Sequence, residues 1–140
     1  MLDTDVAWAA GFFDGEGSVT GRIASWQGRS NLDLRLQVGQ VKPEPLEKFL
    51  ALFGGHLYLQ KAQHKGWSDI YRWWVGGSAR VQPVLVSMLP YLTVKRPQAE
   101  VGIELCSLNI GGILGQDKLR VGHLMSALTE LNRRGVPIIG

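Results

Sequence analysis

The feature that most constrains the fold is a strict alternation of apolar and polar residues in the first third of the chain. Every second position there is apolar: Leu32, Leu34, Leu36 and Val38. Period two is typical of a strand that buries one side and exposes the other. A weaker alternation over residues 19–26 precedes it, across the polar segment 27–30. The two stretches together predict an antiparallel hairpin.

A second hairpin is predicted further along the chain. Residues 56–60 and 70–75 alternate in the same way, and the polar segment 61–69 between them is expected to form a loop. The segments outside the hairpins have helical periodicity instead. A helix is expected at each place where apolar residues recur at three and four positions, before each hairpin and after the second.

The ends of these helices carry recognisable signals. Asp3 and Thr4 can each cap the first helix, which is expected to end at Gly17. Pro43 and Glu44 suit the first turn of the second helix. Beyond residue 77 the chain is predicted to be helical, with breaks at Pro90, at Pro97 and at residues 111–112, and with a last helix that stops at Gly135.

The order helix, hairpin, helix, hairpin, helices predicts an α+β fold with helices on one side of an antiparallel sheet. A chain of 140 residues, 45% of them apolar, has material for one core, so residues 1–140 are expected to form a single domain. The lone cysteine, Cys106, is expected to be a small core residue. No stretch is apolar for long enough to cross a bilayer, and Asp3 and Asp5 stand where a secretory signal carries basic residues. A soluble, intracellular protein without a membrane partner is therefore expected.

The most informative run is AAGFFDGEG, from Ala9 to Gly17. Gly11 and Gly15 remove side chains from one side of the predicted helix, so another backbone can approach it closely. Asp14 and Glu16 lie near the C-terminal end of the helix, where the helix dipole disfavours negative charge. Such a placement indicates a cation or a structural demand. The alternative is a core helix that carries two acids into solvent.

The run resembles the signature of the LAGLIDADG homing endonucleases. Ala10, Gly11, Asp14 and Gly17 match the Ala, Gly, first Asp and last Gly of that signature, and Glu16 stands at the position of its catalytic acid. The element order resembles the family over nearly the whole chain. The resemblance implies the αββαββα fold, with a curved four-stranded antiparallel sheet. It also implies that the signature helices of two units cross at close range, with carboxylates at their ends holding divalent metal beside the scissile phosphates.

The resemblance to this signature implies a metal site at the end of the first helix. Glu16 is the expected ligand, and the resemblance implies the backbone carbonyl of Gly15 as a second one. Two carboxylates brought together repel each other unless a cation lies between them, and hard oxygen ligands suit Mg²⁺, with Mn²⁺ or Ca²⁺ as substitutes in binding. Asp14 is expected to serve the structure. The three histidines are scattered without ligand spacing, so zinc is not expected.

Two further residues are assigned by their positions in the resemblance. Gln40, at the end of the second predicted strand, stands where the family often has a polar residue that contacts active-site solvent. Lys95, before the Pro97 helix, stands where it often has a basic one. The implied catalytic roles are water ordering and charge stabilisation. Pro43 and Glu44 depart from the family, because some members carry an extra basic residue just after the Gln40 position.

The polar sides of the predicted strands form a candidate DNA-reading surface. Donors, acceptors and aromatic groups are mixed there: Thr20, Arg22, Trp26, Asn31, Asp33, Arg35, Gln37, His56, Tyr58, Gln60, Arg72 and Trp74. Arg and Gln can pair with guanine and adenine edges, and a two-stranded ribbon fits the major groove. The basic residues Arg29, Lys61 and Lys65, with His64, are expected in hairpin loops facing phosphates. The alternative is a solvated sheet face with two aromatics at the core edge.

Only one copy of the signature is present, so one chain is expected to hold half a site. Two chains are expected to meet along Trp8, Gly11, Phe12 and Gly15, which implies a nearly palindromic target cut on both strands. The predicted function is a homodimeric, Mg²⁺-dependent, site-specific DNA endonuclease encoded by a mobile intron. An intron RNA-binding maturase and a noncatalytic DNA-binding regulator are the alternatives. With nine Arg, six Lys and three Asn, the composition favours a bacterial, archaeal or phage cytoplasm over an organelle.

Overall fold

The computed structural model describes residues 1–113 and 115–134. In chain order the main elements are α1 (Asp3–Glu16), β1 (Gly17–Trp26), β2 (Arg29–Gln40), α2 (Glu44–Phe53), β3 (His56–Gln60), β4 (Ile70–Gly76), α3 (Ser78–Met88), α4 (Arg96–Leu108) and α5 (Lys118–Arg134). Short 3₁₀ turns at Leu89–Tyr91 and Gly115–Asp117 precede α4 and α5. The predicted order of helices and hairpins is confirmed.

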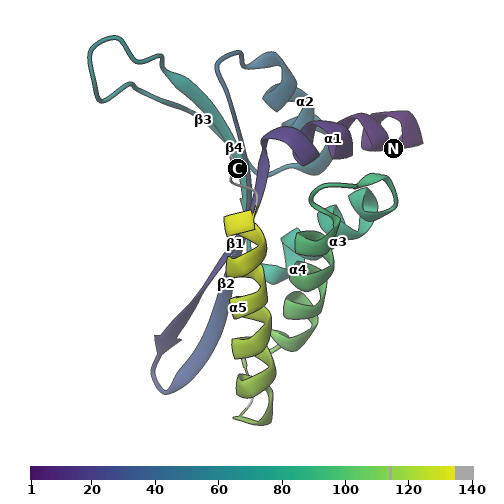
Figure 1. The fold of residues 1–140 in the computed structure, drawn as a ribbon, viewed down its shortest axis with the longest axis vertical. Helices are drawn as coiled ribbons and strands as arrows, with labels where there is room; N and C mark the ends of the chain where they lie inside the picture. Colours follow the sequence, from purple (N-terminus) through teal and green to yellow (C-terminus); the bar gives the residue numbers. More distant parts are fainter. Residues whose placement is uncertain (114, 135–140) are drawn as a thin grey trace.

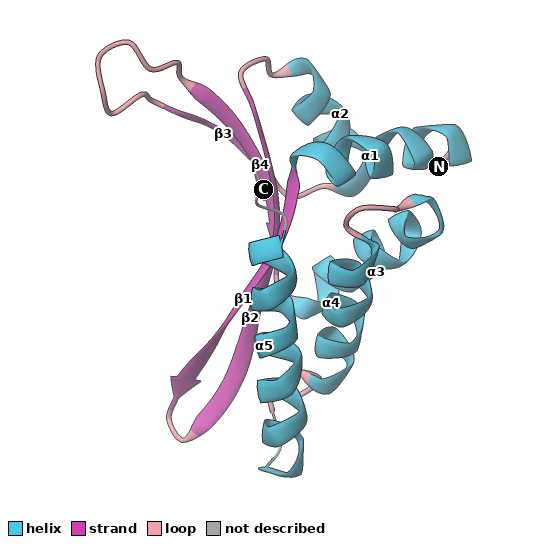
Figure 2. Cartoon of the chain, in the orientation of Figure 1, coloured by secondary structure: helices cyan, strands magenta, loops and turns pink. Residues whose placement is uncertain are grey.

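The strands form one antiparallel sheet in the order β1-β2-β4-β3. Figures 1 and 2 show that the sheet is curved and twisted and that the helices lie on one side of it. The tip of the β1–β2 hairpin and the long β3–β4 loop extend toward opposite ends of the sheet. The α+β architecture inferred from the alternation is therefore confirmed.

The core lies between the sheet and the helices. The apolar positions of β2 are all buried, as are Trp73 and Val75 of β4. On α1 the buried residues are Val6, Ala9, Ala10 and Phe13, so this helix packs one side into the core. Cys106 is also buried, and burial raises the pKa of its thiol to about 11 despite a hydrogen bond with Ser78. The thiol is therefore protonated at neutral pH, as expected of a core residue.

The first helix begins and ends differently from the prediction. It starts at Asp3 with Leu2 as its N-cap, and no side chain caps it, so the expected capping by Asp3 or Thr4 is wrong. Asp3 and Asp5 instead lie in the first turn, where the helix dipole favours acids. Gly17 has an extended backbone and begins β1.

The first hairpin turn is also shorter than expected. Gln27 and Gly28 both have positive φ and form a two-residue turn, so Arg29 and Ser30 belong to β2. Arg29, expected in a loop, is paired with Trp26 at the end of the ladder. In the last helix Leu124 and Leu128 are buried as its periodicity predicts, while the expected stop at Gly135 lies outside the described residues.

Candidate active site and nucleic-acid interface

Glu16 lies at the junction between α1 and β1. A side chain at the next residue, Gly17, would collide with the ring of Phe13, which is fully buried one turn earlier. The glycine therefore lets the chain turn from helix to strand tightly against the core. Glu16 itself is exposed and forms no hydrogen bond or ion pair with any of the described residues. The junction thus fixes the backbone of an acid whose carboxylate stays available.

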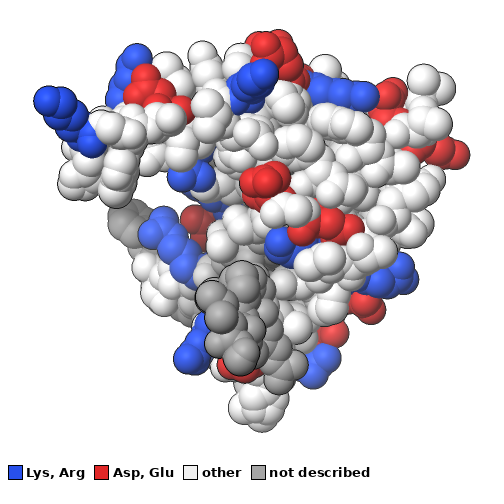
Figure 3. Space-filling view, turned by 45° about the horizontal axis from the view of Figure 1, so that its top comes forward, with Lys and Arg blue, Asp and Glu red and all other residues white. Residues whose placement is uncertain are grey.

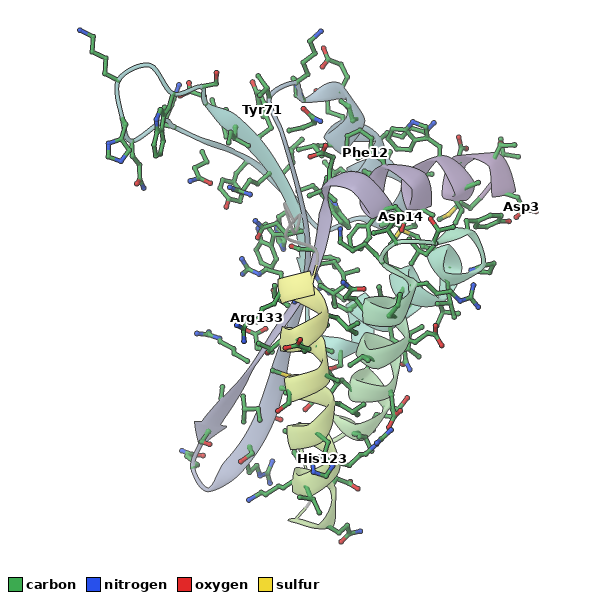
Figure 4. All side chains as sticks on the ribbon, viewed as in Figure 1. Asp3, Phe12, Asp14, Tyr71, His123 and Arg133 are labelled. Atoms are coloured by element: carbon green, nitrogen blue, oxygen red, sulfur yellow. The ribbon has the colours of Figure 1, made fainter. Side chains whose placement is uncertain are left out.

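Asp14 ties the end of α1 to the segment that precedes α4. Its carboxylate accepts hydrogen bonds from the backbone N–H of Thr93, the hydroxyl of Thr93 and the backbone N–H of Lys95, each at 2.9 Å. Burial raises the pKa of this carboxyl, but the hydrogen bonds from Lys95 and Thr93 outweigh burial and hold the pKa below its usual value. Figure 4 shows Asp14 on the side of α1 that faces this segment. Asp14 therefore has the structural placement that was expected.

The same contacts bring Lys95 beside the signature run. Its ammonium group donates to the backbone carbonyl of Asp14 at 3.2 Å, and its side chain is half-buried. Lys95 therefore contacts the backbone two residues before Glu16, with its charge at the C-terminal end of α1, where the helix dipole favours a cation.

Gln40 and Glu16 line the same open hollow, which has a volume of about 350 Å³. Its remaining lining residues are Gly39, Val41, Ile70 and Arg72. The side-chain oxygen of Gln40 accepts a hydrogen bond from the backbone N–H of Val41, which leaves its amide N–H groups free to donate. Lys95 is not among the lining residues. Two of the three predicted catalytic residues thus share a hollow, and the third lies beside the helix end.

The glycine side of α1 is uncovered in the single chain. Gly11 and Gly15 are exposed, and a side chain at either position would meet no atom within 4 Å. Trp8 and Phe12 are half-buried because they pack against Phe49 of α2, with ring centroids 5.6 and 5.9 Å from its ring. Figure 4 shows Phe12 on the α2 side of the helix. Of the four residues expected at a dimer interface, two are open and two partly occupied by the chain itself.

The strand register places the predicted polar residues on one face of the sheet. Thr20 pairs with Arg35, Arg22 with Asp33, and Gln37 with both Ser18 and Trp74. Across the second hairpin, His56 pairs with Trp74 and Tyr58 with Arg72. Directly paired residues in antiparallel strands point to the same side. By the period of two along each strand, Asn31, Gln60 and position 26 belong to the same side as these pairs. We call this side of the sheet, opposite the helices, the polar face.

Several side chains on the polar face hold one another. Arg22 forms an exposed ion pair with Asp33 at 3.2 Å. The guanidinium of Arg35 lies 4.0 Å from the centroid of the Trp74 ring, and the His56 ring stacks on the same indole at 4.4 Å. Because β2 and β3 flank β4 on opposite sides, Arg35 and His56 reach Trp74 from opposite sides. The face therefore carries a preformed stack of three side chains.

The β3–β4 loop presents the basic residues expected there. Lys61 and Lys65 are exposed, and Asp69 accepts hydrogen bonds from the backbone of Ala62 and from Lys61, which hold the base of the loop. The sequence analysis missed Trp67, which packs edge-on against the His64 ring yet remains 66% exposed. An aromatic residue in an otherwise polar loop was the available signal.

Acidic and basic side chains elsewhere on the surface are interspersed. Figure 3 shows Lys and Arg mixed with Asp and Glu over the face in view.

Residues 1–113 and 115–134 contain no group of three or more His, Cys, Asp or Glu side chains that could hold a metal. None of the described helices is both long enough and apolar enough to cross a bilayer.

The geometry defines a fold class, and comparison with solved structures identifies it. The chain has the fold of the LAGLIDADG homing endonucleases, as in I-GzeII bound to its DNA target, with a TM-score of 0.61, 17% identity and coverage of 90% of this chain and 42% of that one. No family model and no curated protein matches the sequence.

Single-motif-sized structures match over most of their length. The archaeal intron-encoded homing endonuclease I-Vdi141I, complexed with DNA, superposes with a TM-score of 0.74 and 20% identity, covering 99% of this chain and 90% of that one. The homing endonuclease I-CvuI, in complex with its target in the presence of Ca, superposes with a TM-score of 0.71 and 22% identity, covering 92% and 82%. At these identities the likeness establishes the fold, and it confirms the αββαββα architecture that the signature implied.

Proposed function

We propose that this protein is a site-specific double-strand DNA endonuclease that works as a homodimer and requires a divalent metal. The observation that carries the proposal is the position of Glu16. It is an exposed, unpaired carboxylate at the end of a glycine-faced helix, and it lines a hollow together with Gly39 and Arg72 of the polar face. An RNA-binding maturase or a DNA-binding regulator has no need of such an acid at this place. DNA binding by solved proteins of this fold supports the same conclusion.

The oxygen donors present fit a hard divalent cation. The Glu16 carboxylate and the Gly15 carbonyl are the ligands that this chain would supply, and they are too few to hold an ion alone. Mg²⁺ is bound in such sites by one or two carboxylates together with phosphate oxygens and water. When bound, the ion would activate a water and neutralise charge on the phosphate. A second subunit and the DNA would therefore complete the coordination.

The other proposed catalytic groups act through their own chemistry. Gln40 can orient a water molecule with its free amide N–H groups, while Lys95 places a positive charge beside the end of α1. Hydrolysis consumes one water for each phosphodiester bond broken. The polar face would supply base contacts, and Lys61 and Lys65 would bind phosphates. Two copies related by a two-fold axis would cut both strands of a nearly palindromic site, which suits intron mobility.

Replacing Glu16 tests the nuclease directly. A target duplex is first selected from a randomised palindromic library by binding to the protein in Ca²⁺, and Mg²⁺ is then added. Wild-type protein is expected to cut both strands, while Glu16→Gln should keep its affinity in Ca²⁺ within about tenfold and lose cleavage by a factor of about 10³ or more. Glu44→Gln, an exposed acid at the start of α2, is the matched control. Unchanged cleavage by Glu16→Gln would remove this residue from the mechanism.

Replacing Gly11 tests the dimer. Gly11→Leu adds a branched side chain on the open side of α1, where it meets no atom of its own chain. We expect the monomer to stay folded and the dimer to be lost, because the two helices can no longer approach closely. Sedimentation measures the oligomeric state, and Ala51→Leu on the exposed side of α2 is the control. An intact dimer of Gly11→Leu would place the interface elsewhere.

A further inference from the structure

A row of three residues crosses the polar face at the entrance to the Glu16 hollow. Gly17 of β1 pairs with Val38 of β2, so Glu16, one residue earlier, comes level with Gly39. Gly39 pairs in turn with Arg72 of β4. The row therefore has a carboxylate at one end, a residue without a side chain in the middle, and a guanidinium at the other end.

The missing side chain at Gly39 creates the space between the two charges. Neighbouring strands lie about 4.8 Å apart, so the backbones at the two ends of the row are about 10 Å apart. A side chain at Gly39 would come within 3.0 Å of Nη1 of Arg72, which shows that the guanidinium extends across β2 over this glycine. Glu16 and Arg72 nonetheless form no ion pair with each other. They face each other across the hollow.

The guanidinium is held in this direction by one neutral partner. Nε of Arg72 donates to the side-chain oxygen of Gln60 at 2.5 Å. This bond uses one of the five N–H groups of the guanidinium and leaves the four on the two Nη atoms for a ligand. Among residues 1–113 and 115–134, no carboxylate is paired with Arg72. Its positive charge is therefore uncompensated and fixed in place, unlike that of Arg22.

From these observations we infer that Arg72 is a catalytic residue that binds the phosphate acted on at Glu16, rather than a residue that reads a base. This inference rests on the proposed function. A guanidinium matches two phosphate oxygens at once and stabilises the extra negative charge of the transition state. Arg72 forms no covalent bond with the substrate; it acts through hydrogen bonds and charge. Gln60 acts through Arg72 and is a positioning residue.

The test separates catalysis from base reading. The full-length protein is assayed on the Ca²⁺-selected duplex, and the cleavage rate constant is measured in Mg²⁺ with protein in excess, so that all the DNA is bound. Arg72→Ala should slow this rate by about 10² to 10³ and change the dissociation constant in Ca²⁺ by less than about tenfold. Arg72→Lys should recover part of the rate, because a point charge remains. Gln60→Leu should lower the rate by a smaller factor than Arg72→Ala. The double variant Gln60→Leu/Arg72→Ala should be no slower than Arg72→Ala alone, because Gln60 acts through Arg72.

Arg80→Ala, which removes an exposed arginine of α3 away from the polar face, is the matched control, and it should leave the cleavage rate within about threefold. Thermal unfolding of each variant checks folding. The inference is overturned if Arg72→Ala cuts as fast as wild type, or if a duplex reselected for that variant differs at a base pair and is cut normally. The proposed function fails separately, if wild type never cuts or if Glu16→Gln still cuts.

Discussion

The two ends of the polar face are built on different principles. Toward the β1–β2 turn and in the middle of the sheet, charged groups have partners: Arg22 forms an ion pair with Asp33, and Arg35, in the middle of β2, lies against Trp74. At the end near α1, Glu16 has no partner, and Arg72 has only the neutral Gln60. Under the proposed function, the charges that have partners would hold side chains in the orientations needed to distinguish base edges, while the unpaired charges would be available for a metal ion and a phosphate. The proposal therefore assigns recognition and chemistry to different parts of one sheet.

The largest expected effect that tests this division is on base preference. Arg35→Ala should reduce discrimination at one base pair in each half-site by about 1–3 kcal/mol, because a guanidinium held against an indole presents a rigid pair of donors. Trp74→Phe should keep most of the preference, and Trp74→Ala should lose it without adding to the loss in Arg35→Ala. Binding to all single-base variants of the selected duplex, measured in Ca²⁺, gives these values.

Lys65→Ala is the control for this experiment. It should weaken binding to every sequence equally and reduce the slope of log affinity against log salt by about one. If Arg35 and Lys65 variants affected all sequences alike, the polar face would not read bases, and the division between its two ends would fail.

A smaller effect is expected on stability, at the end near α1. Asp14→Asn removes the charge that accepts three hydrogen bonds from Thr93 and Lys95, and it should lower the free energy of unfolding by about 1–2 kcal/mol at pH 7. The folded state lowers the pKa of Asp14, so this contribution is complete above the unfolded pKa of about 3.9 and is lost as the pH falls through the lower folded value.

Denaturant titrations of wild type and Asp14→Asn between pH 7 and pH 3 measure this contribution. The difference between the two proteins should shrink at the acid end. Glu100→Gln, which removes an exposed ion pair with Arg96, should cost only about 0.5 kcal/mol. A difference for Asp14 that stayed constant down to pH 3 would mean that its carboxylate does not stabilise the fold through its charge.

Local patterns predicted the sheet well, because period two determines both the strands and the sides to which their residues point. The alternation over β2 was enough to place Arg35 and Gln37 on the face opposite the core. Turn geometry was less accessible: nothing in the polar segment 27–30 required the positive φ at Gln27, and Arg29 was therefore assigned to a loop. Likewise, the N-terminus of α1 has acids that could cap it but uses no side chain.

The candidate site was predictable only where a motif stood in the sequence. Glu16 and Asp14 follow from the signature resemblance, but the partners of Asp14 lie 79 and 81 residues away, and no local pattern connects them. The position of Arg72 beside Glu16 depends on the pairing of β2 with β4, which is set by the whole sheet. Sequence periodicity could place Arg72 on one face of the sheet, but it could not place Arg72 level with Gly39 and Glu16.

The collision that a side chain at Gly17 would suffer against Phe13 has an evolutionary consequence. The position of the acidic group at the helix end is thus a property of the hydrophobic interior, and not of the polar face. Under the proposed function, residues of the polar face can diversify toward new target sequences without disturbing the junction that carries Glu16. Conversely, an enlarged or reduced interior residue at position 13 would misplace the acid while the polar face stayed intact, so libraries for retargeting are best confined to the solvent side of the sheet.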